Sequence, residues 1–118
     1  MANKLLVQCS AGRDEAERAT LPFVIANVAV TAEQETVVFL TLEAVRLATR
    51  GTADGVQKSG LPPLLEVMQA FVGNGGQIWA CAACTKPRGI SDADLIEGAR
   101  IVTAVNVVEF LAAGAKTL

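Results

Sequence analysis

The sequence predicts a three-layer α/β fold, in which helices cover both faces of a mostly parallel sheet of four to five strands. Two observations lead to this fold class. Short apolar runs typical of buried strands occur at intervals along the chain, and the segments between them carry apolar residues at helical spacing. The chain has 118 residues and no internal repeat, linker or low-complexity segment, so we expect one domain over residues 1–118.

Four segments are predicted to be strands because they are short, apolar and bounded by turn-forming residues. Continuous apolar runs of this kind are typical of parallel strands that are buried on both faces. The predicted strands are Lys4–Cys9, Thr36–Leu40, Gln77–Ala80 and Ala99–Val102. If the sheet has a fifth strand, we expect it within a segment read here as loop or short helix.

Helices are predicted between these strands from apolar spacing and from residues that favour helix ends. Ser91 and Asp94 have the spacing of a capping box, and the polar residues 51–60 are predicted to form a loop. The predicted helical segments are Thr20–Ala32, Pro62–Gly73 and Thr103–Ala113, with shorter ones at Thr41–Thr49 and Ser91–Gly98.

The segment Thr20–Ala32 is apolar nearly all round, which is unusual for a helix at the surface of a monomer. We expect Thr20 to cap it and Pro22 to lie in its first turn. The face expected to pack on the core comprises Leu21, Val24, Ile25, Val28, Ala29 and Ala32, and the face expected to contact another subunit comprises Phe23, Ala26 and Val30. We therefore predict a homo-oligomer, either a trimer or a multiple of it, or a dimer.

Composition and charge exclude several classes of partner. The chain is 52% hydrophobic, has a formal net charge of −2 and contains only 4% aromatic residues. Without a basic run or aromatic residues for stacking, we expect no nucleic acid. No stretch has the length of a membrane span or the pattern of a signal peptide, so we expect no membrane and a cytoplasmic protein.

The cysteines are the residues that indicate chemistry. The chain has three cysteines and no histidine, which excludes histidine-assisted nucleophiles and most zinc sites. Cys81 and Cys84 form a C-x-x-C pair directly after a predicted strand, and Lys86 and Arg88 follow within a few residues. In parallel sheets the carboxyl ends of strands are where ligands bind and reactions occur. Nearby cations favour a thiolate over a thiol.

Several roles for this pair stay open at the level of sequence. With Cys9 the chain offers three thiols for a zinc ion that prefers about four ligands, so we expect no metal and no cofactor. A thioredoxin-type disulfide is chemically feasible, although the pair comes late in the chain. A third role is a nucleophilic thiolate that accepts sulfur. One of the two cysteines could also simply pack in the core, as we expect of Cys9.

Other residues are expected at the same edge of the sheet. Gly12 and Asp14 follow the first strand in a turn that could accept an anion. Thr41 and Glu43 follow the second strand. Together with Lys86, we assign Gly12, Thr41 and Glu43 as candidate substrate-binding residues, and Cys81, Cys84 and Arg88 as candidate catalytic residues.

The pattern C-x-x-C-x-x-x-R-G-I, here Cys81–Ile90, resembles the DsrE family of sulfur-relay proteins, which includes DsrE-, DsrF- and TusD-like members. Asp14–Phe23 and Leu95–Ala99 are also similar to that family, so the resemblance spans essentially the full chain. It implies a DsrE/F-like three-layer fold, oligomers with the thiol near a subunit boundary, and transient persulfides. In the relay subunits the sulfur-carrying cysteine stands eight residues before the glycine of Arg-Gly, which implies Cys81 here.

The functional prediction is therefore a sulfur-relay protein, or sulfurtransferase, that carries sulfur as a cysteine persulfide between donor and acceptor proteins. Whether it is an enzyme is left open. The resemblance and the charges disagree on the carrier: the family spacing implies Cys81, which we take as the carrier, whereas the shorter separation from Lys86 and Arg88 favours Cys84. The alternative is a non-catalytic oligomeric binding or redox-regulatory module with structural or sensing cysteines.

Overall fold

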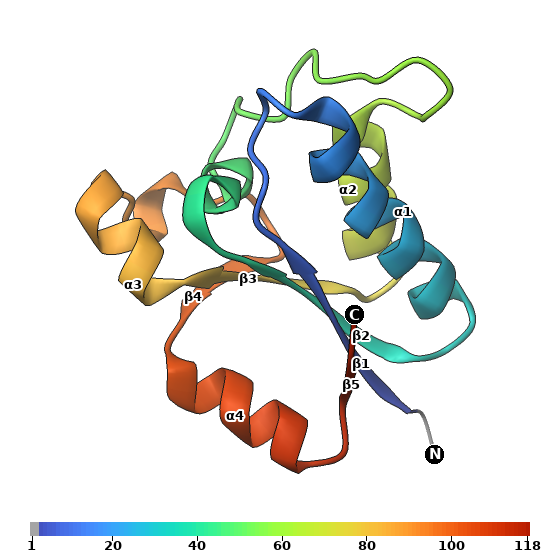
Figure 1. The fold of residues 1–118 in the computed structure, drawn as a ribbon, viewed down its shortest axis with the longest axis vertical. Helices are drawn as coiled ribbons and strands as arrows, with labels where there is room; N and C mark the ends of the chain where they lie inside the picture. Colours follow the sequence, from blue (N-terminus) through green and yellow to red (C-terminus); the bar gives the residue numbers. More distant parts are fainter. Residues whose placement is uncertain (1–2) are drawn as a thin grey trace.

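The computed structural model describes residues 3–118 and has an α/β architecture built on one five-stranded sheet (Figure 1). The strands are β1 (Lys4–Cys9), β2 (Glu35–Leu40), β3 (Gln77–Cys81), β4 (Ala99–Val102) and β5 (Lys116–Thr117). Their order across the sheet is β4-β3-β2-β1-β5, and every pair of neighbours is parallel. The predicted fold class is confirmed, and all four predicted strands are present.

Helices cover both faces of the sheet, as Figure 1 shows, with α1 and α2 on one side and α4 on the other. The α-helices are α1 (Ala16–Thr31), α2 (Leu64–Gly73), the short α3 (Ala82–Thr85) and α4 (Ala104–Ala112). Three segments are 3₁₀ helices, namely η1 (Leu42–Ala48), η2 (Lys86–Arg88) and η3 (Asp92–Asp94). No helix among residues 3–118 has the length and apolar character needed to cross a membrane.

Two hydrophobic clusters correspond to the two faces of the sheet. The larger one lies under α1 and α2, where the rings of Phe23 and Phe71 meet edge to face at 6.1 Å. The smaller one lies under α4 and includes an edge-to-face contact between Trp79 and Phe110 at 5.4 Å. Successive strand residues alternate between these clusters because side chains in a strand point to opposite faces.

Helix α1 differs from its prediction in both its start and its orientation. It begins at Ala16, so Thr20 lies inside the helix, and its buried hydroxyl has no hydrogen-bond partner among residues 3–118. Pro22 is also interior. The predicted faces are reversed, because Phe23 and Ala26 are fully buried whereas Val28 is 65% exposed. Both stripes are apolar, so helical spacing alone could not decide which one meets the sheet; the large Phe23 ring fills the space beside Phe71.

Two further differences concern short segments. The Ser91–Asp94 capping box forms as predicted, but its helix ends at Asp94 instead of running to Gly98. The chain does not close with a helix, because β5 follows α4 and is the fifth strand. Lys116 pairs with Leu5, so β5 lies beside β1 at the edge of the sheet. A two-residue strand is too short to leave an apolar pattern.

Candidate thiol site

Cys81 and Cys84 lie where β3 leaves the sheet. Cys81 is the last residue of β3, and Cys84 is the third residue of α3, which begins directly afterwards. Both cysteines are free and partly buried. The predicted position at the carboxyl edge of a parallel sheet is therefore what the structure shows, and the turn from strand to helix leaves both thiols partly accessible.

The sulfur of Cys84 accepts a hydrogen bond from the backbone N–H of Leu42, with 3.1 Å between nitrogen and sulfur. Leu42 begins η1, just after β2 ends at Leu40, so this contact joins the ends of two neighbouring strands. The backbone of Leu42 is left-handed, with φ of 53°, a conformation that favours glycine. Its side chain is 57% exposed.

Glu43 links the same segment to the residues that follow the cysteines. Its carboxylate accepts from Nε of Arg88 at 2.9 Å and from Nε of Arg46 at 3.1 Å. Arg88 also donates through Nη1 to the backbone carbonyl of Cys84 at 3.1 Å. The bond from Arg88, with a smaller contribution from Arg46, holds the pKa of Glu43 below its usual range. Arg88 thus contacts a carboxylate and a carbonyl oxygen rather than sulfur.

The structure brings most of the predicted site residues together. Gly12 packs against Glu43 so closely that a Cβ at position 12 would lie 3.2 Å from the Cβ of Glu43. Thr41 donates its N–H to the carbonyl of Cys9 at 3.0 Å, which joins the ends of β1 and β2. Lys86 is exposed and takes part in no side-chain hydrogen bond or ion pair among residues 3–118. It is the predicted residue that the structure leaves apart from the others.

A positively charged hollow adjoins this cluster. Its lining includes the three arginines Arg46, Arg50 and Arg88 and a single carboxylate, that of Asp94. Arg50 is held by the backbone carbonyls of Leu95, at 2.9 Å, and Ala93. Hydrogen bonds from Ser91 keep the pKa of Asp94 below its usual range. Clustered guanidinium groups of this kind attract anionic groups.

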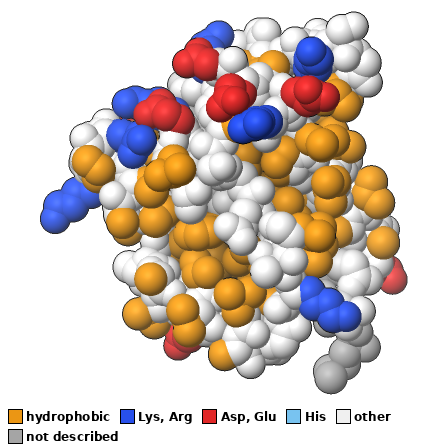
Figure 2. Space-filling view, in the orientation of Figure 1, with side chains coloured by type: hydrophobic (Ala, Val, Ile, Leu, Met, Phe, Trp, Pro, Cys, Tyr) orange, Lys and Arg blue, Asp and Glu red, His pale blue; other side chains and the backbone are white. Residues whose placement is uncertain are grey.

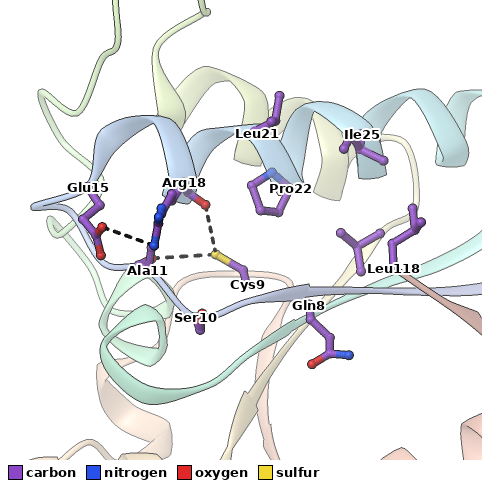
Figure 3. Close-up of a pocket in the computed structure, with 11 residues that line it drawn as sticks. Gln8, Cys9, Ser10, Ala11, Glu15, Arg18, Leu21, Pro22, Ile25 and Leu118 are labelled. Carbon is purple, nitrogen blue, oxygen red and sulfur yellow. Dashed lines mark hydrogen bonds and ion pairs between the residues drawn. The ribbon is translucent and has the colours of Figure 1, made fainter.

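Cys9 lies in a different environment, shown in Figure 3. It borders a pocket of about 340 Å³ between β1 and α1, and its thiol is within hydrogen-bonding range of the carbonyls of Ala11, Arg18 and Ala19. Arg18 has a free carbonyl because Pro22, four residues on, lacks the N–H that would bond to it. Burial raises the pKa of Cys9 to about 11. The expectation that Cys9 packs in the core agrees with these contacts.

In the part of the chain that the structure describes, no three histidine, cysteine or acidic side chains form a group able to hold a metal ion. Cys9 therefore does not join Cys81 and Cys84 in a cluster of ligands.

Sequence reasoning missed three residues of this site: Leu42, Arg46 and Arg50. The ion pair between Arg46 and Glu43 could have been predicted from the sequence, since opposite charges three residues apart lie on the same side of a helix. Arg50 follows a predicted short helix without any pattern that indicates its partners. Leu42 gave no signal, because a left-handed backbone is expected at glycine or asparagine and not at leucine.

The fold and the site together define a class of protein, an all-parallel three-layer α/β protein with a C-x-x-C pair at the carboxyl edge of the sheet. The family comparison specifies the class further. The model of the DsrE/DsrF-like family matches residues 3–118, so the chain belongs to the DsrE/DsrF-like family. The resemblance noted from the sequence is confirmed.

Related sequences and structures agree with this assignment. The chain is 28% identical over 109 residues to the uncharacterized protein MJ0760 of Methanocaldococcus jannaschii, covering 92% of the chain but 40% of that protein. It is 30% identical over 95 residues to the uncharacterized protein MK0008 of Methanopyrus kandleri, covering 80% of the chain and 75% of that protein. This chain thus spans less than half of the first relative.

Two solved structures share the fold. The crystal structure of the ychN protein from E. coli superposes with a TM-score of 0.79 at 22% identity, covering the whole of both chains. A protein of unknown function from Methanobacterium thermoautotrophicum, MTH1491, has a TM-score of 0.72 at 16% identity and covers 98% of this chain and 97% of its own. At these identities the likeness concerns the fold.

Proposed function

We propose that this protein is a sulfur carrier that holds sulfane sulfur as a persulfide on its C-x-x-C pair and passes it from a donor protein to an acceptor protein. One observation supports this most strongly: two free, partly exposed thiols lie three residues apart at the carboxyl edge of the sheet in a DsrE/DsrF-like chain. Sulfur relay is the function associated with that family.

The proposed chemistry is a balanced exchange of sulfur bonds. A thiolate of the pair attacks the outer sulfur of a donor persulfide, a new S–S bond forms, and the donor thiolate leaves with the electron pair of the old bond. An acceptor thiolate later attacks that outer sulfur and releases the cysteine thiolate of the carrier. No oxidant is needed, because the sulfur keeps its oxidation state throughout.

The surrounding residues have supporting roles in this proposal. Arg88 holds the backbone of Cys84 and the carboxylate of Glu43, so it fixes the loop that bears the thiol. Lys86 is exposed and follows Cys84 by two residues, and it would attract anionic donors such as persulfides. Gly12, Thr41 and Glu43 would contact a substrate or partner in this proposal; Gly12 packs against Glu43, which is bonded to Arg88.

Mass spectrometry of the intact protein tests the proposal. After incubation with inorganic polysulfide and removal of excess reagent, we expect the mass of one additional sulfur atom on the wild type, removable by a reducing agent. The double variant Cys81→Ser/Cys84→Ser serves as the control and should gain nothing, whereas Cys9→Ala should load like the wild type. If the wild type stays unloaded with every donor, the non-catalytic binding or redox-regulatory module becomes the better account.

We further propose that the protein works as a homo-oligomer, a trimer or a multiple of it, or a dimer. Exposed apolar side chains support this, with Leu21, Ile25 and Val28 on α1 and Val105 and Val108 on α4. Figure 2 shows hydrophobic side chains gathered over much of the face where α1 and α4 lie. Such an apolar surface is unusual for a small monomer. Analytical ultracentrifugation tests it, and a species of 12.3 kDa would contradict it.

A relay of this kind needs thiols that remain reduced between cycles. All three cysteines are free in the structure. We therefore propose the cytoplasm as its place of action, since reducing systems there keep cysteines as thiols. Fractionation of cells that express the tagged protein would check this, and recovery from an oxidising compartment would contradict it.

A further inference from the structure

The two thiols of the pair differ in what their sulfur atoms contact. The Leu42 N–H points at the sulfur of Cys84 from 3.1 Å. Among residues 3–118, no comparable donor contacts the sulfur of Cys81, which ends β3 without any side-chain hydrogen bond. A hydrogen bond to the charged form of a group favours that form, and bonds that involve an ion are about twice as strong as neutral ones. The Leu42 amide therefore favours negative charge on Cys84.

The backbone of Leu42 is in a strained, left-handed conformation, and its amide contacts the sulfur of Cys84. A left-handed backbone is unfavourable for leucine, because its Cβ comes too close to the following carbonyl oxygen. Burial does not offset this cost, because the Leu42 side chain is 57% exposed. The neighbouring amides of Thr41 and Ala44 donate to backbone carbonyls, at 3.0 Å each, whereas the amide of Leu42 is turned toward sulfur. Strain of this kind is typical of functional sites.

The position of this donor is fixed in advance. Glu43, the residue after Leu42, is bonded to Arg88 at 2.9 Å, and Arg88 is bonded to the carbonyl of Cys84 at 3.1 Å. A second arginine, Arg46, holds the other oxygen of the same carboxylate. The segment that bears the donor and the segment that bears the thiol are therefore tied together by side chains. A donor held in place stabilises developing charge without reorganising during the reaction.

From this geometry, and resting on the proposed function, we infer that Cys84 is the cysteine that carries the sulfur, that the Leu42 amide stabilises its sulfur atom as an anion, and that Cys81 is the resolving thiol. The amide acts twice in each cycle. In loading, it stabilises the Cys84 thiolate that attacks the donor. In delivery, it stabilises the same thiolate as the leaving group when the acceptor takes the outer sulfur.

The role of Cys81 follows from the same chemistry. Its thiolate can attack the inner sulfur of the Cys84 persulfide, form a Cys81–Cys84 disulfide and release the outer sulfur as hydrosulfide. Two thiols are then oxidised to a disulfide while the sulfane sulfur is reduced to sulfide, so atoms and electrons balance. This reaction empties a carrier that has met no acceptor, and it requires a reductant such as a cellular thiol to reset the pair.

Two single variants test which cysteine carries the sulfur. With inorganic polysulfide as the donor, Cys84→Ser should load at least about tenfold more slowly than the wild type, since it lacks the stabilised thiolate. Cys81→Ser should load at the wild-type rate and keep the added sulfur longer. Fragmentation mass spectrometry should locate that sulfur on Cys84. Loading of Cys84→Ser at the wild-type rate, together with no loading of Cys81→Ser, would overturn the inference but leave the proposed function standing. A wild type that never loads would overturn both.

Two further measurements isolate the role of the amide. In a Cys9→Ala/Cys81→Ser variant, the Leu42 amide proton should resonate downfield of its position in the same variant with Cys84→Ser added, because the N–H then loses its sulfur acceptor. Semisynthetic protein with a backbone ester in place of the Leu42 amide lacks this N–H and weakens the Thr41 carbonyl as the acceptor of Ala44. We expect its loading to slow by about tenfold or more. An ester at Leu61, in the loop before α2, is the matched control. An unchanged loading rate in the Leu42 ester would show that the Leu42 amide does not stabilise the sulfur of Cys84, which would overturn this part of the inference.

Discussion

Cys9 ends β1 and Cys84 lies just beyond β3, so both are at the carboxyl edge of the sheet, yet their sulfur atoms have opposite hydrogen-bonding environments. Cys9 faces three backbone carbonyls, which can accept a hydrogen bond from its protonated thiol but would repel a negative charge on its sulfur. Cys84 faces a backbone N–H, which favours the anion. The comparison teaches that position at the carboxyl edge does not by itself make a cysteine reactive. Reactivity depends on whether a backbone N–H or a carbonyl faces the sulfur, and on the access of solvent to it.

The largest expected difference concerns alkylation. The rise in the pKa of Cys9 from 9.0 to about 11 lowers its thiolate fraction near neutral pH by about a hundredfold, and burial lowers its reactivity further. In the native protein at pH 8, iodoacetamide should label Cys84 while Cys9 stays unlabelled. Peptide mass spectrometry over time measures this. In guanidinium chloride Cys9 should react like any other cysteine, and equal labelling of both in the native state would break the comparison.

The second prediction concerns stability at alkaline pH. Because the pKa of Cys9 is raised on folding, its thiol contributes fully below pH 9, and that contribution is lost as pH rises through about 11. A shift from 9.0 to about 11 corresponds to about 3 kcal/mol of unfolding free energy. Urea titrations at pH 8 and pH 11 under reducing conditions measure the loss.

The matched variants for this test are Cys9→Ala and Val7→Ala. Cys9→Ala should lose less stability than the wild type between pH 8 and pH 11, although it starts from a lower value. Val7→Ala removes buried volume from the same strand but no ionisable group, so it should keep the wild-type dependence on pH. Equal slopes for all three proteins would show that Cys9 ionises in the folded state as easily as in the unfolded chain.

A third prediction concerns Pro22, whose missing N–H leaves the carbonyl of Arg18 available to the thiol of Cys9. Proline inside a helix costs about 3 kcal/mol, and replacing it returns about 1 kcal/mol of chain entropy to the unfolded state. Pro22→Ala should therefore raise the unfolding free energy by about 2 kcal/mol, since the new amide at position 22 bonds to Arg18. Chemical denaturation measures it. Pro62→Ala, before α2, interrupts no helical bond and should give no such gain.

The smallest expected effect concerns the Glu43 contacts beside Cys84. Its pKa is lowered mainly by the Arg88 bond, so the stabilisation is present at neutral pH and lost as pH falls through the lowered pKa, below the usual 4.5. Glu43→Gln should lower the thermal midpoint at pH 7, only slightly because this carboxylate is exposed. At pH 3 it should not lower the midpoint. Glu17→Gln, on the exposed side of α1, is the control and should change neither value.

The sequence predicted the sheet well because its strands are buried on both faces and leave continuous apolar runs. Lys4–Cys9 and Ala99–Val102 were predicted with the bounds that the structure has. The position of the C-x-x-C pair followed from the apolar run Gln77–Ala80, since the residue after a buried strand lies at the sheet edge. Local patterns were sufficient for these features.

Features that depend on tertiary contacts could not be predicted in this way. The orientation of α1 depends on which of two apolar stripes fits the sheet, and the fit of Phe23 against Phe71 decides it. The strained Leu42 depends on Cys84, which lies 42 residues further along the chain. Thr20 resembled a helix cap because its neighbours could be helical, but the alanines before it extend the helix to Ala16.

The pairing of β1 with β5 has a consequence for how the chain folds. Leu5 pairs with Lys116, and Leu118 exchanges backbone bonds with Leu6 and Gln8, so the first strand is completed by residues from the opposite end of the sequence. During synthesis, β1 can pair with β2 long before β5 leaves the ribosome. Until then one edge of β1 is an unpaired template for another chain. Docking of β5 is expected to be a late folding step, because contacts between residues so far apart form slowly.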